Sequence, residues 1–307
     1  MSPRAAIVIP SYGRPDLLRR TLQSLVDAQW PPSFTGVWVV ENGPQTGLEA
    51  LCAEFAARLP LHYVHEPLLG SSAARNAGAR ACDGDVILFL DNDVRVEPVA
   101  LHAYAEAFAD YPQAGAFGGP LQPEYETPPL DWLVPYLPWS VVGVDYGPRN
   151  RPLDEAWLMG ANHAVTHEAL QDAGWYDAVD AVGKRGGVGE ETRLQERILA
   201  GGRPLVYVAG GLVWHHVPAS HCSPQWALAR VFRHGLTRGL LDPPRGRYRL
   251  AGAPLWAWQR WLRLSLRALA RRLCRESLEQ RFALEYERAE WAGVIAGCRK
   301  TGGEHVL

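Results

Sequence analysis

Residues 86–94 read VILFLDNDV, and they restrict the possible folds more than any other stretch. Five consecutive apolar residues are typical of a strand buried on both faces, which occurs in parallel sheets covered by helices. Asp91 and Asp93 follow directly, so we expect them at the carboxyl end of that strand, where open α/β sheets bind ligands. Two carboxylates so close together suit a hard divalent cation and a diphosphate. The alternative is a solvated turn, because Asp and Asn also favour turns.

The composition is that of an ordinary globular protein. The 307 residues are 47% apolar and 21% charged, enough for one large α/β domain or a domain with an appendage. The net charge of −2 gives no argument for nucleic-acid binding. The five cysteines form no CxxC pair, which indicates neither a zinc site nor a disulfide framework. Free thiols, no recognisable signal peptide and no apolar run of about 18 residues together predict a cytoplasmic protein.

Strand–loop–helix units surround the central strand. The loop after the first strand carries Tyr12, able to stack on a base, and Arg14, able to meet a phosphate, although a plain connecting loop fits equally. Glu41 ends the second strand, where it could hold a ribose hydroxyl or a base edge, or cap the next helix. We expect strands over residues 5–10, 36–40, 61–65, 86–90, 113–118, 205–208 and 211–214, and helices over 17–26, 45–58, 98–110 and 193–200.

The segment GSSAARNAGA, residues 70–79, has small residues that let a helix start approach a ligand or the sheet closely. Arg75 and Asn76 supply donors for phosphate or hydroxyl oxygens. No Gly-Lys-Ser/Thr follows, so this is not a Walker A loop. The dinucleotide fingerprint GxGxxG is also missing, which disfavours a Rossmann oxidoreductase.

Four of these motifs occur together and in order: IVIPSYGRPDLLRRTLQSL, VVENG, GSSAARNAGA and FLDND. As a set they resemble the family 2 glycosyltransferases, over about residues 4–220. The resemblance implies a GT-A fold, a Rossmann-like mixed and mostly parallel sheet flanked by helices, with a C-terminal helical extension. It divides the chain into a transferase domain over 1–220 and a helical region over 221–307. It also implies a UDP-, GDP- or dTDP-sugar donor, a Mn²⁺ or Mg²⁺ cofactor, and a glycan, lipid-linked or small-molecule acceptor.

The resemblance assigns the donor nucleotide site by position. It implies that Pro10, Tyr12, Arg14 and Glu41 surround the base and ribose, and that Arg75 contacts the nucleotide side. Many relatives have Asp where this chain has Glu41.

The resemblance also assigns the metal site. Asp91 and Asp93 form the Asp-x-Asp motif, with Asp93 as the direct ligand and Asp91 also near the nucleotide. His215 matches the histidine that often completes such a site, and imidazole suits Mn²⁺ better than Mg²⁺. A structural histidine is the alternative, and the next residue, His216, usually varies in the family.

The donor sugar and the base fall in the second half. WLMGANHAV, residues 157–165, resembles the segment beneath the donor sugar; Gly160 allows close approach, and Asn162 either orients the sugar or satisfies a backbone group. A glycine-rich stretch over 186–189 leads into Glu190 and Glu191. In the family the second acid of a Glu-Asp pair takes the proton of the acceptor hydroxyl, so we expect Glu191 as the base and Glu190 in support. Alternatively, both acids merely favour the positive end of the next helix.

Two further regions have open interpretations. Residues 120–155 are rich in proline and aromatic residues and form a mobile lid, an acceptor wall or a packed surface loop. Beyond residue 220 we expect helices over 226–241, 255–274 and 278–296. The second of these has an apolar stripe beside a row of arginines, so it either lies on an anionic membrane at its inner face, or docks on the catalytic domain or on a second subunit as a homodimer. Docking is the commoner outcome and is our expectation. The stripe is Leu255, Trp258, Leu262, Leu266, Leu269 and Leu273, and the row is Arg260, Arg263, Arg267 and Arg271.

The leading interpretation is an inverting, metal-dependent glycosyltransferase. A nucleotidyltransferase shares the sheet and paired acids, but usually has a glycine-rich basic loop that SYGRPD lacks. A non-catalytic protein that binds nucleotide-sugar or glycan is a second alternative, and the presence of Asp93 and Glu191 argues against it.

Overall fold

The structure is a computed structural model that describes residues 3–177 and 189–302. The part of the expected glycine-rich stretch over 186–188 lies outside the described residues. The described chain divides into two compact units. The first comprises residues 3–124, 139–177 and 189–217, and the second comprises residues 125–138 and 218–302.

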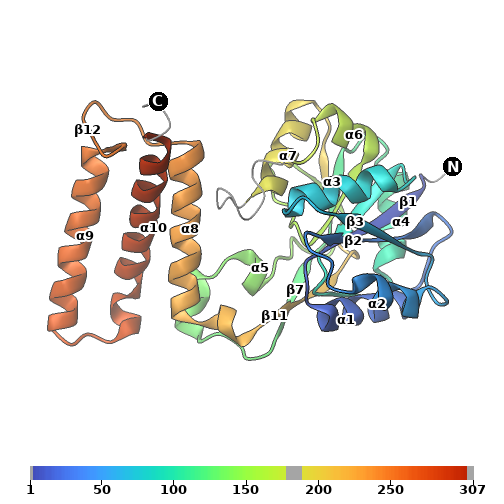
Figure 1. Cartoon of the computed structure of the whole chain (residues 1–307), viewed down its shortest axis with the longest axis horizontal. Helices are drawn as coiled ribbons and strands as arrows, with labels where there is room; N and C mark the ends of the chain where they lie inside the picture. Colours follow the sequence, from blue (N-terminus) through green and yellow to red (C-terminus); the bar gives the residue numbers. More distant parts are fainter. Residues whose placement is uncertain (1–2, 178–188, 303–307) are drawn as a thin grey trace. The chain divides into compact units, whose positions relative to one another are not determined.

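The first unit is built on a central sheet. Within the described residues this sheet has eight strands, in the order β3-β2-β1-β4-β9-β6-β10-β8. Figure 1 shows this sheet, with β1, β2 and β3 labelled. β1 pairs in parallel with β2 and β4, whereas β9 runs antiparallel between β4 and β6. The expected α/β class with a mixed, mostly parallel sheet is confirmed. The strands are β1 (Ala5–Ser11), β2 (Phe34–Asn42), β3 (Leu61–Glu66), β4 (Val86–Leu90), β6 (Ala116–Gly118), β8 (Arg151–Leu153), β9 (Asn162–Thr166) and β10 (Leu205–Tyr207).

Helices cover both faces of this sheet. In β1 the side chains alternate, so that Ile7 and Ile9 join one apolar core while Ala6 and Val8 join the other. Both cores are closed by helices, which is why β4 is apolar at every position. One face carries α1 (Pro15–Val26), α2 (Leu48–Phe55) and α4 (Ala100–Asp110), and the other carries α3 (Ser71–Ala81), α6 (His167–Asp172) and α7 (Glu190–Ala200).

A small second sheet lies beside the carboxyl end of β4. It contains β5 (Val94–Val96), β11 (Val213–Val217) and β7 (Leu121–Tyr125), in the order β5-β11-β7. β11 pairs antiparallel with β5, which sets His215 opposite Val94. The sequence predicted that this strand would end at residue 214. It instead continues through both histidines, because the backbone of His215 pairs with β5.

Several other element boundaries also differ from the expectation. α7 begins at Glu190 rather than at residue 193, and β6 begins at Ala116 rather than at residue 113. β2 continues to Asn42, so Glu41 lies in the strand rather than in the loop after it, and α2 begins at Leu48 rather than near residue 45. Residues 120–155 are less irregular than expected, since they contain β7, η1 (Asp131–Tyr136), α5 (Trp139–Val142) and β8. The rings of Trp132 and Tyr136 pack against Phe282, with centroids 5.2 and 4.9 Å apart, which favours the packed-loop alternative for this part.

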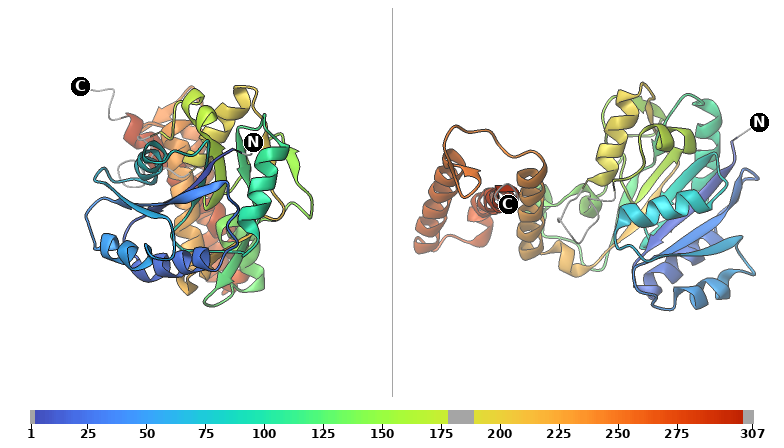
Figure 2. Two further views of the ribbon diagram at one scale, coloured as in Figure 1. Left: turned by 90° about the vertical axis from the view of Figure 1, so that its right-hand side faces the viewer. Right: turned by 45° about the horizontal axis from the view of Figure 1, so that its top comes forward.

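The second unit is helical. It contains η3 (Ala219–Cys222), α8 (Pro224–Leu241), α9 (Leu255–Leu273) and α10 (Leu278–Gly302), with a small hairpin of β12 (Arg249–Leu250) and β13 (Ala253–Pro254) before α9. Figure 2 shows α10 between α8 and α9. Glycines bring α8 and α10 into close contact, because a Cβ on Gly235 would lie 2.1 Å from the carbonyl oxygen of Glu290. No helix in residues 3–177 and 189–302 is long and apolar enough to cross a membrane.

Within the described part of the chain, α9 packs against α10 through a face other than its leucine stripe, and the expected docking of the stripe on the catalytic domain or on a second subunit stays a prediction. Ala257, Leu264 and Ala268 are the buried residues of this helix, and they belong to the core formed with α10. Leu262 and Leu266 are exposed by 53% and 59%. The packed face is thus formed by Ala257, Leu264 and Ala268, and the leucines of the stripe lie outside it.

Candidate functional site

The carboxyl end of β4 collects polar side chains from several elements. Asp91 follows the strand directly, and its backbone N–H donates to the carbonyl oxygen of Ala161 (3.3 Å). The amide of Asn92 is buried and donates from Nδ2 to Oγ of Ser11 at the end of β1 (2.8 Å). These two hydrogen bonds anchor Asp91 to Ala161 and Asn92 to Ser11, so the short segment that carries the two aspartates is fixed in place.

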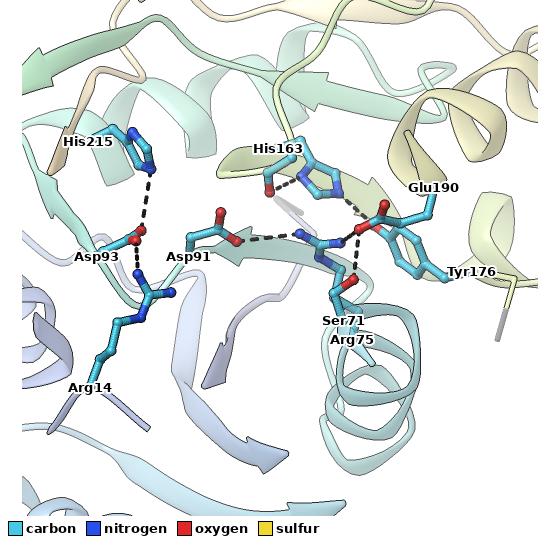
Figure 3. A network of polar contacts seen from close by, with 10 residues as sticks. Arg14, Ser71, Arg75, Asp91, Asp93, His163, Tyr176, Glu190 and His215 are labelled. Carbon is cyan, nitrogen blue, oxygen red and sulfur yellow. Dashed lines mark hydrogen bonds and ion pairs between the residues drawn. The ribbon is translucent and has the colours of Figure 1, made fainter. Parts of the chain in front are cut away.

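The carboxylate of Asp93 lies between the guanidinium of Arg14 and the imidazole of His215 (Figure 3). One oxygen, Oδ2, accepts a hydrogen bond from the guanidinium of Arg14 (2.8 Å). The other, Oδ1, lies 3.5 Å from Nε2 of His215. Both Oδ1 of Asp93 and Nδ1 of His215 are buried and have no hydrogen-bond partner in the described part of the chain. An unpaired buried carboxylate oxygen facing an imidazole is the donor set that a divalent cation would satisfy.

These residues fit a cation that takes its other ligands from a substrate. Asp93 and His215 have side chains only 10% and 14% exposed, whereas the side chain of Asp91 is 38% exposed and reaches solvent. No cluster of three or more acidic, histidine or cysteine side chains able to hold a metal is found among residues 3–177 and 189–302. Hard cations accept phosphate oxygens readily, so Asp93 and His215 could share the ion with a diphosphate. Of the expected ligands Asp91, Asp93 and His215, the structure thus brings Asp93 and His215 together. His215 is favoured over His216, whose ring faces Arg20 (3.4 Å).

A buried ion pair joins α3 to the start of α7. NH1 of Arg75 lies 2.8 Å from Oε1 of Glu190, and the two side chains are 5% and 8% exposed. The hydroxyl of Ser71 donates to the same oxygen (2.8 Å), and NH2 of Arg75 lies 3.4 Å from Oδ1 of Asp91. Burial raises the pKa of Glu190, but Arg75 and Ser71 outweigh it and lower the pKa to about 2. Glu190 is therefore a permanently charged partner of Arg75.

Glu191 has the opposite protonation behaviour. Burial, and next the negative charge of Glu190, raise the pKa of its carboxyl group to about 7. When protonated, it is near enough to hydrogen-bond to Glu190. A Cβ on Gly160 would lie 3.1 Å from Cδ of Glu191, so the carboxyl group rests on the glycine backbone. Two neighbouring acids with pKa values pushed apart are typical of an acid–base site, and of these two only Glu191 has a pKa near neutral pH.

The segment under Glu191 is held by residues that the sequence analysis did not identify. Gln195 of α7 accepts from the backbone N–H of Leu158 and donates to its carbonyl oxygen, both at 2.9 Å. Nδ1 of His163 lies 2.9 Å from the carbonyl oxygen of Gly160, and its Nε2 lies 2.5 Å from the hydroxyl of Tyr176. Burial and the nearby Arg75 lower the pKa of His163 to about 3, so the ring is neutral, with Nδ1–H donating and Nε2 accepting.

The residues expected at the base and ribose have different surroundings: Tyr12 is exposed, whereas Glu41 is buried. Tyr12 is 59% exposed, and a Cβ on Gly43 would lie 3.5 Å from its ring, so the two loops meet there. Glu41 is buried, and its carboxylate accepts from the hydroxyls of Thr46 (2.7 Å) and Tyr63 (2.6 Å). Burial raises the pKa of Glu41, but these hydrogen bonds lower it more, to below its ordinary value. Both oxygens of the carboxylate are thus engaged within the protein, one by Thr46 before α2 and the other by Tyr63 of β3. Pro10 lies in β1 and is partly buried.

Asn162 corrects an expectation. Its side chain is fully buried, accepts from the hydroxyl of Tyr104 (2.7 Å) and donates to the carbonyl oxygens of Pro120 (3.0 Å) and Gly211 (2.8 Å). No polar atom is left for a sugar, so Asn162 serves the backbone, which was the alternative. Gly160 lies against the carboxyl group of Glu191, and its expected place beneath the donor sugar stays a prediction.

Comparisons with known proteins give a consistent result. The sequence model described as Glycosyl transferase family 2 matches residues 6–174, which is more than half of the chain. The hyaluronan synthase of Pasteurella multocida is 33% identical over 108 residues, 34% of this chain and 11% of that protein. The succinoglycan biosynthesis protein ExoM of Rhizobium meliloti is 28% identical over 247 residues, 76% of this chain and 74% of that protein. Other relatives are much longer than their match, and this chain covers 31% of AglE of Haloferax volcanii.

Solved structures resemble the fold. The mannosyltransferase PcManGT from Pyrobaculum calidifontis, in complex with GDP-Man and Mn²⁺, has a TM-score of 0.54 at 16% identity, over 100% of this chain and 76% of that chain. TarS 1–349 of S. aureus has a TM-score of 0.55 at 12% identity, over 97% of this chain and 92% of that chain. The expected GT-A fold is confirmed by these neighbours and by the observed sheet.

Proposed function

Because the chain belongs to glycosyl transferase family 2, we propose that it transfers a sugar from a nucleoside diphosphate-sugar to an acceptor hydroxyl, with inversion at the anomeric carbon. The observation that carries the proposal is the raised pKa of Glu191, about 7, in a carboxyl group resting on Gly160. A carboxyl group with this pKa is about half deprotonated near neutral pH, and its carboxylate form can accept a proton efficiently. We assign the transferase domain to residues 1–220 and the helical region to residues 221–307.

The reaction follows as a single displacement. The acceptor oxygen forms a bond to the anomeric carbon, the bond from that carbon to the diphosphate breaks, and Glu191 takes the hydroxyl proton. Attack from the side opposite the leaving group inverts the configuration, and no covalent intermediate with the protein is needed. Glu190 and Arg75 hold the start of α7 so that Glu191 faces the acceptor.

The diphosphate end uses the other half of the site. Asp93 and His215 would hold a divalent cation, Mn²⁺ or Mg²⁺, and when bound this ion would neutralise the leaving diphosphate. The guanidinium of Arg14 donates a hydrogen bond to Oδ2 of Asp93. It can turn toward a phosphate, since the side chain of Arg14 is 56% exposed. Tyr12 presents an exposed ring to the base.

Donor and acceptor are proposed only as classes. The donor is a UDP-, GDP- or dTDP-sugar, and the acceptor is a glycan, a lipid-linked glycan or a small molecule. Hyaluronan synthase, the succinoglycan protein ExoM and the validoxylamine A glucosyltransferase of Streptomyces hygroscopicus are relatives whose names point to carbohydrate or small-molecule products.

Thermal unfolding with UDP, GDP and dTDP, each with and without Mn²⁺, tests the donor site. A nucleotide present at about a hundred times its Kd should stabilise the protein by about 2.7 kcal/mol. We expect one nucleotide to raise the Tm only with metal, and Asp93→Ala to remove the shift. Asp83→Ala, which changes an exposed aspartate elsewhere, should retain it. No shift with any nucleotide would favour a non-catalytic protein.

Glu191→Gln separates catalysis from donor binding. This variant should keep the metal-dependent Tm shift but lose transfer from the sugar nucleotide so identified, measured as release of the nucleoside diphosphate in the presence of acceptor. Turnover like that of the wild type would remove Glu191 from the proposed role.

A further inference from the structure

The outer face of α9 is a continuous apolar stripe. At about 100° per residue, the spacing of its leucines keeps them within an arc of roughly 60°, and the 19-residue helix extends for about 28 Å. The exposed fractions of the side chains rise from 39% at Leu255 to 75% at Leu273. Five large aliphatic side chains left in water on one face indicate a surface that is covered by something else. They are Leu255, Leu262, Leu266, Leu269 and Leu273.

Positive charge accompanies this stripe without any negative charge. Residues 255–275 contain six arginines and no Asp or Glu. Arg260 and Arg272 pair with Glu287 and Glu285 of α10, at 2.5 and 2.6 Å. Arg263 and Arg267 are exposed and form no ion pair within the described part of the chain. Both are on the flank of the leucine stripe, so their charges are free for a ligand.

The hairpin before α9 has the same chemistry. The side chains of Tyr248 and Leu250 are 64% and 55% exposed, and Arg249 lies between them. The hairpin is fixed to the first turn of α9, because the N–H of Leu255 donates to the carbonyl oxygen of Tyr248 (2.9 Å) and Nε1 of Trp258 donates to that of Leu250 (3.0 Å). Exposed apolar and arginine side chains are thus combined at one end of the helix as well as along it.

We propose that α9 lies on an anionic membrane surface. The leucines would enter the boundary between head groups and acyl chains, while Arg263 and Arg267 meet lipid phosphates. Helices of this kind have an apolar face, a basic face and too many charges to cross the bilayer, and they lie in the plane of the interface. Long arginine side chains can reach the head groups while their stems stay in apolar surroundings.

A second copy of the chain is a poorer occupant of this face. Two α9 helices packed through their leucines would have only arginines on their own flanks, because the helix carries no acidic residue to meet them. The stripe itself has no polar side chain among its five leucines that would orient a particular protein surface. A fluid anionic bilayer needs no such matching, so it suits a smooth apolar stripe with flanking positive charge.

Sedimentation of the whole chain with vesicles tests the proposal. We expect binding to vesicles of equal parts phosphatidylglycerol and phosphatidylcholine, and little to phosphatidylcholine alone. Leu266→Glu should weaken binding by at least about tenfold, since it removes a leucine that the membrane would bury and adds a negative charge. Leu130→Glu is the matched control, because Leu130 is 58% exposed and Leu266 is 59% exposed. Both positions are on the surface, so both variants should fold, which circular dichroism would verify.

A second pair of variants tests the charge. Arg263→Gln with Arg267→Gln should weaken partitioning about thirtyfold, from roughly one kcal/mol for each arginine near an anionic surface. Arg80→Gln with Arg149→Gln removes the same charge from exposed positions outside α9 and its hairpin and should have a much smaller effect. Added salt should release the wild type.

Three results would overturn the proposal. One is the absence of sedimentation with either vesicle. Another is equal binding by wild type and Leu266→Glu. The third is a dimer of the wild type in light scattering without vesicles that Leu266→Glu dissociates, because the stripe would then be a contact between copies.

Discussion

Gly160 and the carboxyl group of Glu191 are in direct contact: a Cβ on Gly160 would lie 3.1 Å from Cδ and 3.2 Å from Oε1 of Glu191. Glycine leaves the space that lets the proposed base rest on the segment we assign to the donor sugar. His163 holds the carbonyl oxygen of Gly160 from below, so the glycine backbone has little freedom to move away.

Gly160→Ala should therefore displace the Glu191 carboxyl group by a few tenths of an ångström. Misplacement by about 1 Å can cost about a hundredfold in rate, so we expect kcat to fall roughly tenfold, with a smaller change in KM for the donor. Steady-state kinetics would measure both. Gly201→Ala is the control. Gly201 lies at the C-terminal end of α7, the helix that carries Glu191, and a Cβ there would approach no atom closer than 3.4 Å. An unchanged kcat in Gly160→Ala would mean that the contact has no catalytic consequence.

The rate should depend on pH through Glu191. Only the carboxylate form can accept a proton, so kcat/KM should rise with pH through the pKa of about 7. The charge of Glu190 helps to raise that pKa, and Arg75 lowers it. In Glu190→Gln the charge is gone and Arg75 remains, so the rising limb should move to lower pH. A limb that stays in place, or moves upward, would disprove this coupling.

The same pKa predicts an effect on stability. The folded-state pKa of Glu191 is raised from the ordinary 4.5 to about 7, so the folded protein binds this proton more tightly than the unfolded chain. The contribution to stability is complete below the ordinary pKa and is lost as pH rises through the folded pKa. Glu191→Gln cannot ionise, so its Tm should exceed that of the wild type at about pH 8 and approach it at about pH 4. Glu196→Gln, an exposed position on α7, should show no such pH-dependent difference.

His215→Ala should weaken metal binding without removing the nucleotide site. If Asp93 and His215 hold the cation together, loss of the imidazole should raise the Mn²⁺ concentration needed for the nucleotide-dependent Tm shift by at least about tenfold. His216→Ala provides the comparison, because that ring faces Arg20 instead of the Asp93 carboxylate. Equal metal requirements for the two variants would exclude His215 as a ligand.

The sequence predicted the residues that stand at element ends. Asp91 and Asp93 follow an apolar run whose end is visible in the sequence, and Glu190 begins a helix after a glycine. Parallel strands bring their carboxyl ends to one edge, which is enough to unite the two aspartates with the loop that carries Arg14. The mixed sheet was implied by the resemblance to family 2 glycosyltransferases, and the helical C-terminal region was predicted from the helical spacing of its apolar residues.

What the sequence did not predict depends on packing partners. Asn162 was equally compatible with a sugar contact or a backbone contact, and the difference lies in Tyr104, Pro120 and Gly211, which reach it from other elements. His163 and Tyr176 were missed because no pattern in the sequence indicates that their side chains form a hydrogen bond. On α9, periodicity identified a leucine stripe but could not tell that alanines form the packed face.

The two hydrogen bonds between Gln195 and Leu158 have a mechanical consequence. They tie α7, which supplies Glu191, to the backbone that leads to Gly160, so these two parts cannot shift past each other without breaking both bonds. The spacing between Glu191, the proposed proton acceptor, and the segment that we assign to the donor sugar is thus set before any ligand arrives. In the proposed mechanism, selection among acceptors then falls to the loops around this fixed frame.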